Sequence, residues 1–290
     1  MNFPGHARTQ VPSSSGAFGL SVYGQPPTPG VFDFHLPILA RSVALLRVLL
    51  QDGTVDLDLA SSVIALDPGL AYRVLQLANR DLPDNRDRIW QLPLAIVTAG
   101  RTNLGEVLSQ STQITSTDHC GSVIPGLVAE AVLRACVAHS LARELGSCSP
   151  RKCFLSGSLF ELPGLVTASM PGQLDSHAML LSDMCHSLPV TIVRAALAQV
   201  ASKEGPSDPI VAIVLIAQEL LHAGRLPNSS VPLEELAGAS LWRPWPGTPQ
   251  LQRLKILQRC CELATWAASS LDHMQPWEFM AQLETSKLCE

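Results

Sequence analysis

The sequence predicts an all-α protein made of two packed helical bundles, and three observations support this prediction. Only 5% of the 290 residues are aromatic, and runs of β-branched residues are short. Leucine and alanine, which both favour helices, dominate one segment after another. Apolar residues also recur at spacings of three and four, which is the periodicity of a helix with one buried face.

The first three helices follow from this spacing and from capping residues. A helix begins after Pro37 and ends near residue 52, where a glycine follows. Asp56 is a candidate N-cap for a second helix that runs to about residue 66. Asp67 followed by Pro68 is typical of an N-cap with proline at the first helical position, so it opens a third helix. Because only a few residues join these helices, we expect them to pack as antiparallel or sharply crossed neighbours.

The next elements lead to a boundary between the two bundles. Further helical turns are expected over 89–99 and 104–109, with Gly100 as the break between them. Residues 111–121 are polar and rich in serine and threonine. They precede a longer helix over roughly 123–145, which Gly146 closes as a typical C-terminal capping residue. We place the boundary in the polar stretch.

The second half of the chain carries further helical patterns and one interruption. Pro150 opens a helix to about residue 159. The segment Trp242–Pro246 contains two prolines that a helix does not span, so it is a linker or a docking strap. Periodicity is weak from Pro276 onward. Later helices are expected over 174–185, 189–201, 209–222, 231–237 and from about 249 to 273.

These elements divide the chain into four segments. Residues 1–32 are rich in proline, serine and glycine, and they are predicted to form a disordered arm. Residues 33–115 form the first bundle and residues 120–240 the second. Residues 241–290 contain the strap and a C-terminal helix.

Composition and charge exclude several classes of function. Charged residues make up 16% of the chain, below the roughly 25% usual for soluble domains, so the polar surface is thin. The net charge of −5 offers no general attraction for a nucleic-acid backbone. The longest strongly apolar stretches run for about ten residues, short of the roughly 20 that cross a bilayer, and no apolar signal segment follows the N-terminus. We therefore expect a cytoplasmic protein that binds neither nucleic acid nor membrane.

The cysteines point to reduced thiols. Eight cysteines are too few for a disulfide scaffold in a chain of this length, and none forms a Cys-x-x-Cys pair, so neither a disulfide scaffold nor a metal site is expected. Most of the cysteines have apolar neighbours in the sequence, which indicates buried, reduced thiols. Cys148 and Cys153 flank Ser149 and Pro150 and are close enough in sequence to approach each other.

Short motifs follow one another in a specific order over roughly residues 33–222. They are Leu36-Pro37, Asp67-Pro68-Gly69-Leu70, Leu77-Ala78-Asn79, Leu94-Ala95-Ile96, Ala138-His139-Ser140-Leu141-Ala142, Cys153-Phe154-Leu155-Ser156-Gly157-Ser158-Leu159, Asp175-Ser176-His177-Ala178 and Leu188-Pro189. This succession resembles the HDOD domain, an HD-related output domain of bacterial signal-transduction proteins. The resemblance implies an N-terminal helical bundle packed on a second bundle that is similar to HD phosphohydrolases.

The resemblance also implies a degenerate metal site. An HD phosphohydrolase holds one or two divalent metals with histidines and aspartates from separate helices. His139 matches the first histidine of the family, and His177 matches a later one. The His-Asp dyad falls on Phe160 and Glu161, and a phenyl ring binds no metal. The paired histidines expected further on fall near residues 199–200, a glutamine and a valine. We therefore expect no metal, no cofactor and no catalytic residue, with His139, Glu161 and His177 as the residual metal candidates.

Other interpretations of these residues stay open. His139 also suits a buried position between helices, and Glu161 suits a loop or a helix cap. Arg86 and Arg88 lie in a mixed-charge loop, where they are the best candidates for an anionic ligand. Trp242 and Trp245 are candidates for partner binding, although large aromatic side chains in such a strap also dock into their own chain.

The hypothesis that these observations favour is a stand-alone, non-catalytic HDOD-like signalling protein of a bacterial cytoplasm. It is expected to act by binding a protein partner, by self-association, or by binding a small signalling ligand. One alternative is a divergent metal-dependent HD phosphohydrolase that uses His139, Glu161 and His177. A second alternative is a nucleotide-sensing module with Arg86 and Arg88 on the anion.

Overall fold

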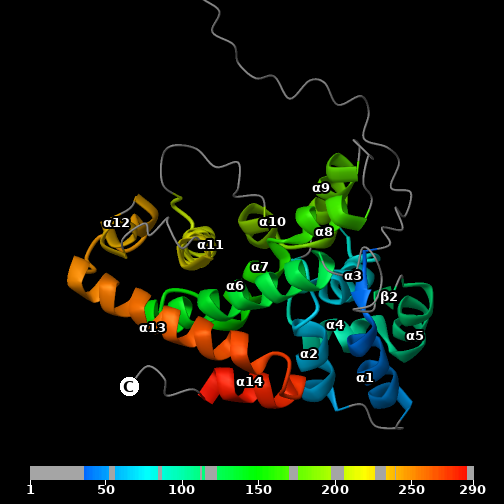
Figure 1. Cartoon of the computed structure of the whole chain (residues 1–290). Helices are drawn as coiled ribbons and strands as arrows, with labels where there is room; N and C mark the ends of the chain where they lie inside the picture. Colours follow the sequence, from blue (N-terminus) through cyan, green and yellow to red (C-terminus); the bar gives the residue numbers. More distant parts are fainter. Residues whose placement is uncertain are drawn as a thin grey trace, which may run out of the picture. The chain divides into compact units, whose positions relative to one another are not determined.

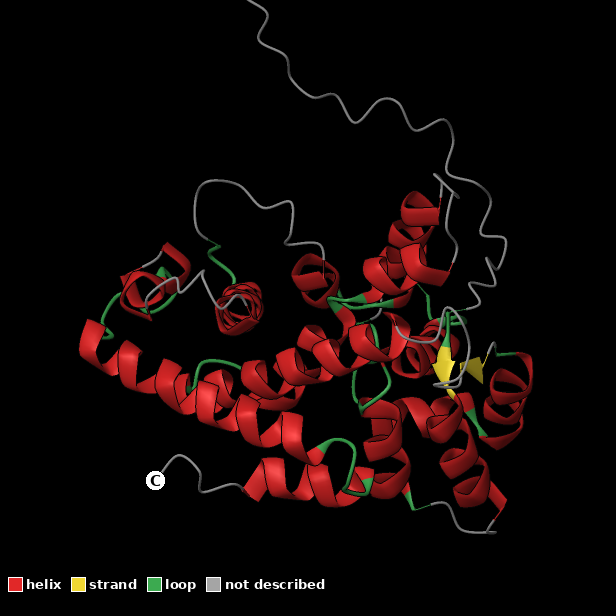
Figure 2. Ribbon diagram, in the orientation of Figure 1, coloured by secondary structure: helices red, strands yellow, loops and turns green. Residues whose placement is uncertain are grey.

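The computed structural model describes most of the chain, and the described part is almost entirely helical (Figure 2). The prediction of an all-α fold is therefore confirmed. The described residues belong to one compact unit, Phe34–Glu290. They cover 36–51, 56–83, 87–111, 113–114, 123–169, 176–196, 206–225, 233–238 and 240–285, so the predicted N-terminal arm lies outside them.

The N-terminal helices lie where the sequence predicted them, as Figure 1 shows in blue to green. They are α1 (Ala40–Gln51), α2 (Leu57–Ala65), α3 (Pro68–Asn79), α4 (Leu92–Ala99) and α5 (Arg101–Gln110). The side chain of Asp56 accepts hydrogen bonds from the backbone N–H groups of Asp58 and Leu59 at the start of α2. Gly100, with a φ of 74°, breaks the chain between α4 and α5. Capping residues therefore set these boundaries as expected.

Asp67 caps α3 and also ties it to a preceding segment. One carboxylate oxygen accepts a hydrogen bond from the N–H of Leu70 at 3.0 Å, and the other accepts from the N–H of Leu39 at 2.9 Å. Burial raises the pKa of this carboxyl to about 6, while the backbone hydrogen bonds act in the opposite sense. The capping carboxylate thus lies in the core of the N-terminal helices.

A short pair of parallel strands is one of the elements that the sequence did not predict. β1 (Ile38–Leu39) pairs with β2 (Gln113–Ile114), in a register that places Ile38 beside Gln113. β2 comes from the polar stretch predicted to separate the bundles. Two residues are too few to show a strand periodicity, which explains the difference.

The central helix α6 (Val123–Leu145) has the predicted bounds, and Gly146 follows it with a φ of 60°. It packs against α7 (Pro150–Leu159), α11 (Pro209–Arg225) and α13 (Gln250–Ser270). By length and composition α6 would suffice to cross a membrane. The sequence does not suggest this at first, because charged residues interrupt the apolar run of this helix. However, 61% of its most apolar window is buried inside the protein, as in the core helix of a soluble protein.

The remaining helices include two that the sequence analysis missed. Both begin next to a proline, α8 (Leu162–Ser169) and α14 (Pro276–Thr285), and proline is tolerated in the first turn of a helix. The others are α9 (Ser176–Ser187), α10 (Val190–Ala196), α12 (Leu233–Gly238) and the short 3₁₀ helix η2 (Ser240–Trp242). α14 packs against α2, so the C-terminal helix lies beside the N-terminal ones (Figure 1).

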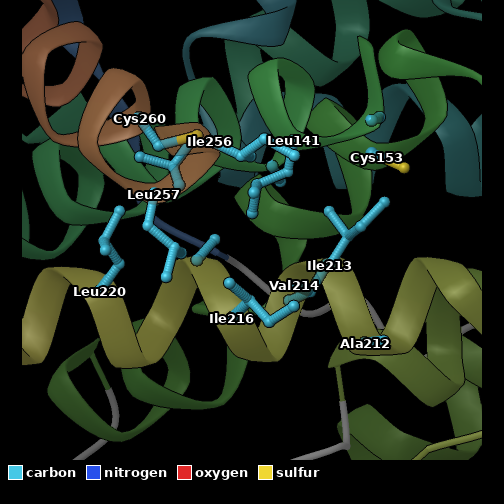
Figure 3. Packing of buried hydrophobic residues seen from close by; sticks show 14 of the residues in the cluster. Leu141, Cys153, Ala212, Ile213, Val214, Ile216, Leu220, Ile256, Leu257 and Cys260 are labelled. Carbon is cyan, nitrogen blue, oxygen red and sulfur yellow. The ribbon is translucent and has the colours of Figure 1, made fainter. Parts of the chain in front are cut away.

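One large cluster of buried side chains lies between α6, α11 and α13. Figure 3 shows Ile213, Ile216 and Leu220 of α11 directed toward Leu141 of α6 and Leu257 of α13. A second cluster joins α14 to α6 and α7 through Phe279, Leu283 and Phe154. Both clusters include residues of α6, so this helix packs against other helices on more than one side.

Candidate functional site

The most unusual polar group in the structure is Arg134, a completely buried arginine on α6. Its Nη2 lies 2.8 Å from Oε2 of Glu161 and 3.3 Å from Oε1 of Glu130. Its Nε donates to the side-chain oxygen of Gln218 on α11. The guanidinium carbon lies 4.7 Å from the centre of the Phe160 ring, in a cation–π contact. One cation therefore joins α6, α11 and the segment that follows α7.

The hairpin of α6 and α7 places Phe160 and Glu161 beside this arginine. Ser149 caps α7 and accepts a hydrogen bond from the N–H of Lys152, so the chain turns back directly after Gly146. The two helices approach so closely at Gly157 that an added Cβ would lie 3.0 Å from the Cα of Ala135. Phe160 is the C-cap of α7, and Glu161 comes directly before α8. Phe160 and Glu161, the two positions that the resemblance led us to expect at a His-Asp dyad, therefore both contact Arg134.

The chemistry of this cluster differs from that of a metal centre. A guanidinium keeps its positive charge and bridges carboxylates through its N–H groups, so it supplies internally the charge that a metal ion would supply. Glu130 and Glu161, the two carboxylates in reach, both accept from it. Within the part of the chain that the structure describes, no group of three or more His, Cys, Asp or Glu side chains is arranged to hold a metal ion.

His139 lies on α6 but belongs to different surroundings. It follows Arg134 by five residues, a rotation of about 140° around the helix. Its side chain is 3% exposed, and its ring meets the edge of Phe154 with 6.5 Å between the ring centres. Its Nδ1 is buried and has no hydrogen-bond partner among the residues that the structure describes. His139 and Glu161 are thus not brought together, and the side chain of His177 lies outside the described residues, although its backbone is part of α9.

His139 lines a cavity of about 720 Å³ between α2, α7 and α14. The lining also includes Trp90 and Trp277, and Arg151 and Glu284 form an ion pair in its wall, with 2.8 Å between Nη2 and Oε1. Burial, together with the charges of Arg143 and Arg151, lowers the pKa of His139 to about 4. The imidazole is consequently neutral at physiological pH.

This low pKa predicts a dependence of stability on pH. Between pH 6.5 and about 4 the unfolded chain takes up a proton on His139 that the folded chain does not, so the free energy of unfolding falls as the pH falls. We expect His139→Leu to remove this contribution, which approaches about 3 kcal/mol near the lower limit. Asp67, whose raised pKa acts in the opposite sense, is common to both proteins and cancels in the comparison.

The comparison needs urea titrations of the wild type and of His139→Leu at several pH values. The difference in unfolding free energy, wild type minus variant, should rise with pH up to about 6.5 and then stay level. A difference that is independent of pH would show that His139 titrates as freely in the folded protein as in the unfolded chain.

Of the two arginines proposed to bind an anion, only Arg88 lies among the residues that the structure describes. Arg88 is half-buried, and its Nη1 donates to the backbone oxygen of Leu82 at 2.8 Å. The neighbouring Ile89 is held by Asn79, whose side-chain oxygen accepts from the Ile89 N–H at 2.7 Å. Arg88 thus contributes to the structure of its own loop, and Arg86 lies outside the described residues.

The two tryptophans proposed for partner binding are buried in their own chain, which corrects that interpretation. Trp242 is 1% exposed and Trp245 is 9% exposed, and their rings meet edge to face with 6.1 Å between centres. The indole N–H of Trp242 donates to the backbone oxygen of Leu236, and that of Trp245 donates to the Ser147 hydroxyl. Packing against α11 and α13 accounts for both side chains. The alternative of self-docking is the one that the structure shows.

Arg134 was missed by the sequence analysis, although a signal was present. It stands among alanine, valine, leucine and cysteine in the middle of a predicted helix, where a charged residue needs a buried partner. Its partner Glu161 lies 27 residues away and Gln218 lies 84 residues away. Such long-range pairing cannot be identified from the local pattern. The sequence therefore indicated that Arg134 needs a buried partner, but it did not indicate which residue that partner is.

Cys148 and Cys153 do approach each other, with 3.2 Å between their sulfur atoms. The hydrogen bond with Cys153 lowers the pKa of the half-buried Cys148 thiol to about 7, and it raises that of the buried Cys153 thiol.

At neutral pH we expect Cys148 to react with iodoacetamide first among the described cysteines, about tenfold faster than Cys153. Peptide mapping of the modified sites tests this, with Cys148→Ser as the control. Faster labelling of the more exposed Cys185 would contradict the prediction.

The chain is similar to several known proteins. The model of the HDOD domain matches residues 36–183, just over half of the chain. A crystal structure of the MmoQ response regulator from Methylococcus capsulatus strain Bath has a TM-score of 0.57 and 20% identity, and covers 76% of this chain and 97% of that one. A second structure of MmoQ, a fragment, has a TM-score of 0.53 and 17% identity, and covers 76% and 94%. No curated protein sequence matches the chain.

Proposed function

Because this chain belongs to the HDOD domain family, whose members are HD-related output domains associated with bacterial signalling, we propose that it is a non-catalytic regulatory protein. It acts by binding rather than by hydrolysis. Its output is a contact with a protein partner or with a second copy of the chain, and its input is a small ligand. Its place of action is the bacterial cytoplasm.

The observation that carries this proposal is the buried ion cluster of Arg134. A divalent metal at the dyad position would have to bind Glu161, whose Oε2 already lies 2.8 Å from the guanidinium. The fixed positive charge of Arg134 would repel a second cation there, and Phe160 offers no lone pair. Loss of the arginine contacts would leave Glu130 and Glu161 buried without a counter-charge, so exchange for a metal is disfavoured.

Two further points support a signalling role. MmoQ, whose structures share the fold of this chain, is described as a response regulator. The chain contains neither the Gly-x-x-x-x-Gly-Lys-Ser/Thr loop that binds nucleotide phosphates nor the Gly-x-Ser-x-Gly elbow of hydrolases. Both points favour a domain that transmits a signal through its surface.

The test is a hydrolysis assay on the full chain with bis(p-nitrophenyl) phosphate and a cyclic dinucleotide, in the presence of Mg²⁺, Mn²⁺, Fe²⁺ or Zn²⁺. The proposal predicts no rate above that of the metal alone. A saturable, metal-dependent rate that is lost in Glu161→Gln but kept in Glu144→Gln would overturn it. Glu144 is a suitable control because it is also a carboxylate of α6 with an arginine partner, but that partner is Arg259, at 3.3 Å.

A further inference from the structure

We propose that the cavity around His139 is a binding site for a small, uncharged, planar N-heteroaromatic molecule. This inference deepens the proposed function, because it gives a ligand class to a protein that acts by binding. The cavity is formed by α2, by the segment before α4, and by α6, α7 and α14. Its volume of about 720 Å³ lies within the range of about 300–1,000 Å³ that is usual for small-molecule sites.

The walls of the cavity suit a flat aromatic ring. Trp90, Phe154 and Trp277 contribute three aromatic side chains from three separate parts of the chain. Met280 adds a flexible thioether, and Leu155 adds an aliphatic surface. Aromatic and sulfur-containing walls pack well against a planar ring system, which gains stacking and edge contacts that an aliphatic ligand does not.

Two buried polar atoms in the lining have no partner. Nδ1 of His139 and Oγ of Ser61 are both shielded from solvent, and neither makes a hydrogen bond within the described structure. Leaving such atoms unsatisfied costs free energy, so buried polar atoms without partners call for an explanation. Because both atoms have almost no accessible surface, a small rotation of the two side chains must bring them to the cavity, where a ring nitrogen and a ring N–H on the ligand would satisfy them. The hydroxyl donates or accepts, and the neutral imidazole does the same through its tautomers.

The charges around the cavity favour an uncharged ligand. The lining carries two carboxylates, Asp58 and Glu284, and one guanidinium, Arg151, which already pairs with Glu284. The ammonium of Lys152, outside the lining, lies 5.7 Å from the centre of the Trp90 ring and offsets the second carboxylate. His139 adds no charge, because burial keeps it neutral. A phosphate or carboxylate on the ligand would thus gain little here, whereas a neutral ring gains the full contact.

The position of the cavity gives ligand binding a structural consequence. Trp277 and Met280 belong to α14, while Ser61 belongs to α2, and these two helices pack against each other. A ligand that touches both helices stabilises the docked position of α14. The site therefore links the C-terminal helix to the N-terminal helices through a bound molecule, as an input site requires.

The probe for this proposal is benzimidazole, a planar bicycle that is uncharged at neutral pH and carries one ring N–H and one ring nitrogen. Calorimetric titration of the full chain should give a Kd on the order of 100 µM, as expected for a ligand of this size. Indene has the same shape but no nitrogen, and it serves as the matched ligand. We expect benzimidazole to bind about tenfold more tightly than indene.

Two variants test the polar contacts, and one serves as a control. His139→Leu and Ser61→Ala should each weaken benzimidazole binding by about five- to tenfold and leave indene binding unchanged. His186→Leu makes the same chemical change on the exposed face of α9, and its affinity for both ligands should equal that of the wild type. No binding of benzimidazole at millimolar concentration, or equal affinities for the two ligands, would overturn the proposal.

A measurement on the wild-type protein keeps the test independent of the folding of the variants. Nitrogen-15 NMR of histidine-labelled protein should show one imidazole, that of His139, whose ring nitrogen signals move on addition of benzimidazole. Unchanged signals at saturation would contradict the proposed contact. The two proposals also fail separately, because metal-dependent hydrolysis would overturn the regulatory function without affecting benzimidazole binding, and absence of binding would leave the regulatory function intact.

Discussion

Replacing Arg134 with methionine is expected to lower the free energy of unfolding by about 3–5 kcal/mol. Methionine fills a similar volume, so the effect comes from the lost contacts of the guanidinium with two carboxylates and one side-chain amide. Without it, Glu130 and Glu161 lose their shared counter-charge, and Gln218 loses its donor. Urea denaturation followed by circular dichroism measures the change.

Two further variants make this prediction specific to the cluster. Arg259→Met removes a cation that is 38% exposed and pairs with Glu144, and we expect it to cost at most about 1 kcal/mol. Adding Glu161→Gln to Arg134→Met should recover part of the loss, because the uncompensated charge is then removed. Equal effects of the two arginine substitutions would contradict the role assigned to Arg134.

The second large effect is expected for Trp242→Ala, which should lower the free energy of unfolding by about 3–5 kcal/mol. Trp242 is among the largest fully buried side chains, and it packs on Trp245 and under Arg253, whose guanidinium carbon lies 5.3 Å from the ring centre. Truncation would leave a cavity between the strap and the core around α11 and α13.

Trp277→Ala is the matched control, since the same side chain is only half-buried there. Its cost should be clearly smaller, and thermal unfolding of both variants compares the two positions. A Trp242→Ala protein of wild-type stability would instead favour a strap that leaves its tryptophans available to a partner.

Capping residues explain why so much of the fold could be predicted. The bounds of α6 and the start of α3 follow from Gly146 and Asp67, whose local preferences agree with the final structure. α8 was missed because Glu161 suits a loop or a helix cap in the sequence, and α14 because the periodicity is weak from Pro276 onward. Both helices have a proline in the first turn, where it is compatible with a helix. Proline is an ambiguous local signal, because it interrupts the interior of a helix but is tolerated in the first turn.

The candidate site was less predictable, because it depends on contacts across the chain. The resemblance placed Phe160 and Glu161 at the dyad position, but it did not identify the cation beside them. His139 was grouped with Glu161 from the order of motifs alone, and the rotation along α6 separates His139 from Arg134, the partner of Glu161. The cavity around His139 is likewise built from helices at opposite ends of the sequence.

We propose that the buried guanidinium of Arg134 takes the place of a metal beside Glu161, and titration with Mn²⁺ followed by electron paramagnetic resonance tests this most directly. The free Mn²⁺ signal should remain undiminished as the full chain is added, and Glu161→Gln should behave in the same way. Stoichiometric loss of the free signal with the wild-type protein, absent in Glu161→Gln and retained in Glu144→Gln, would contradict the account.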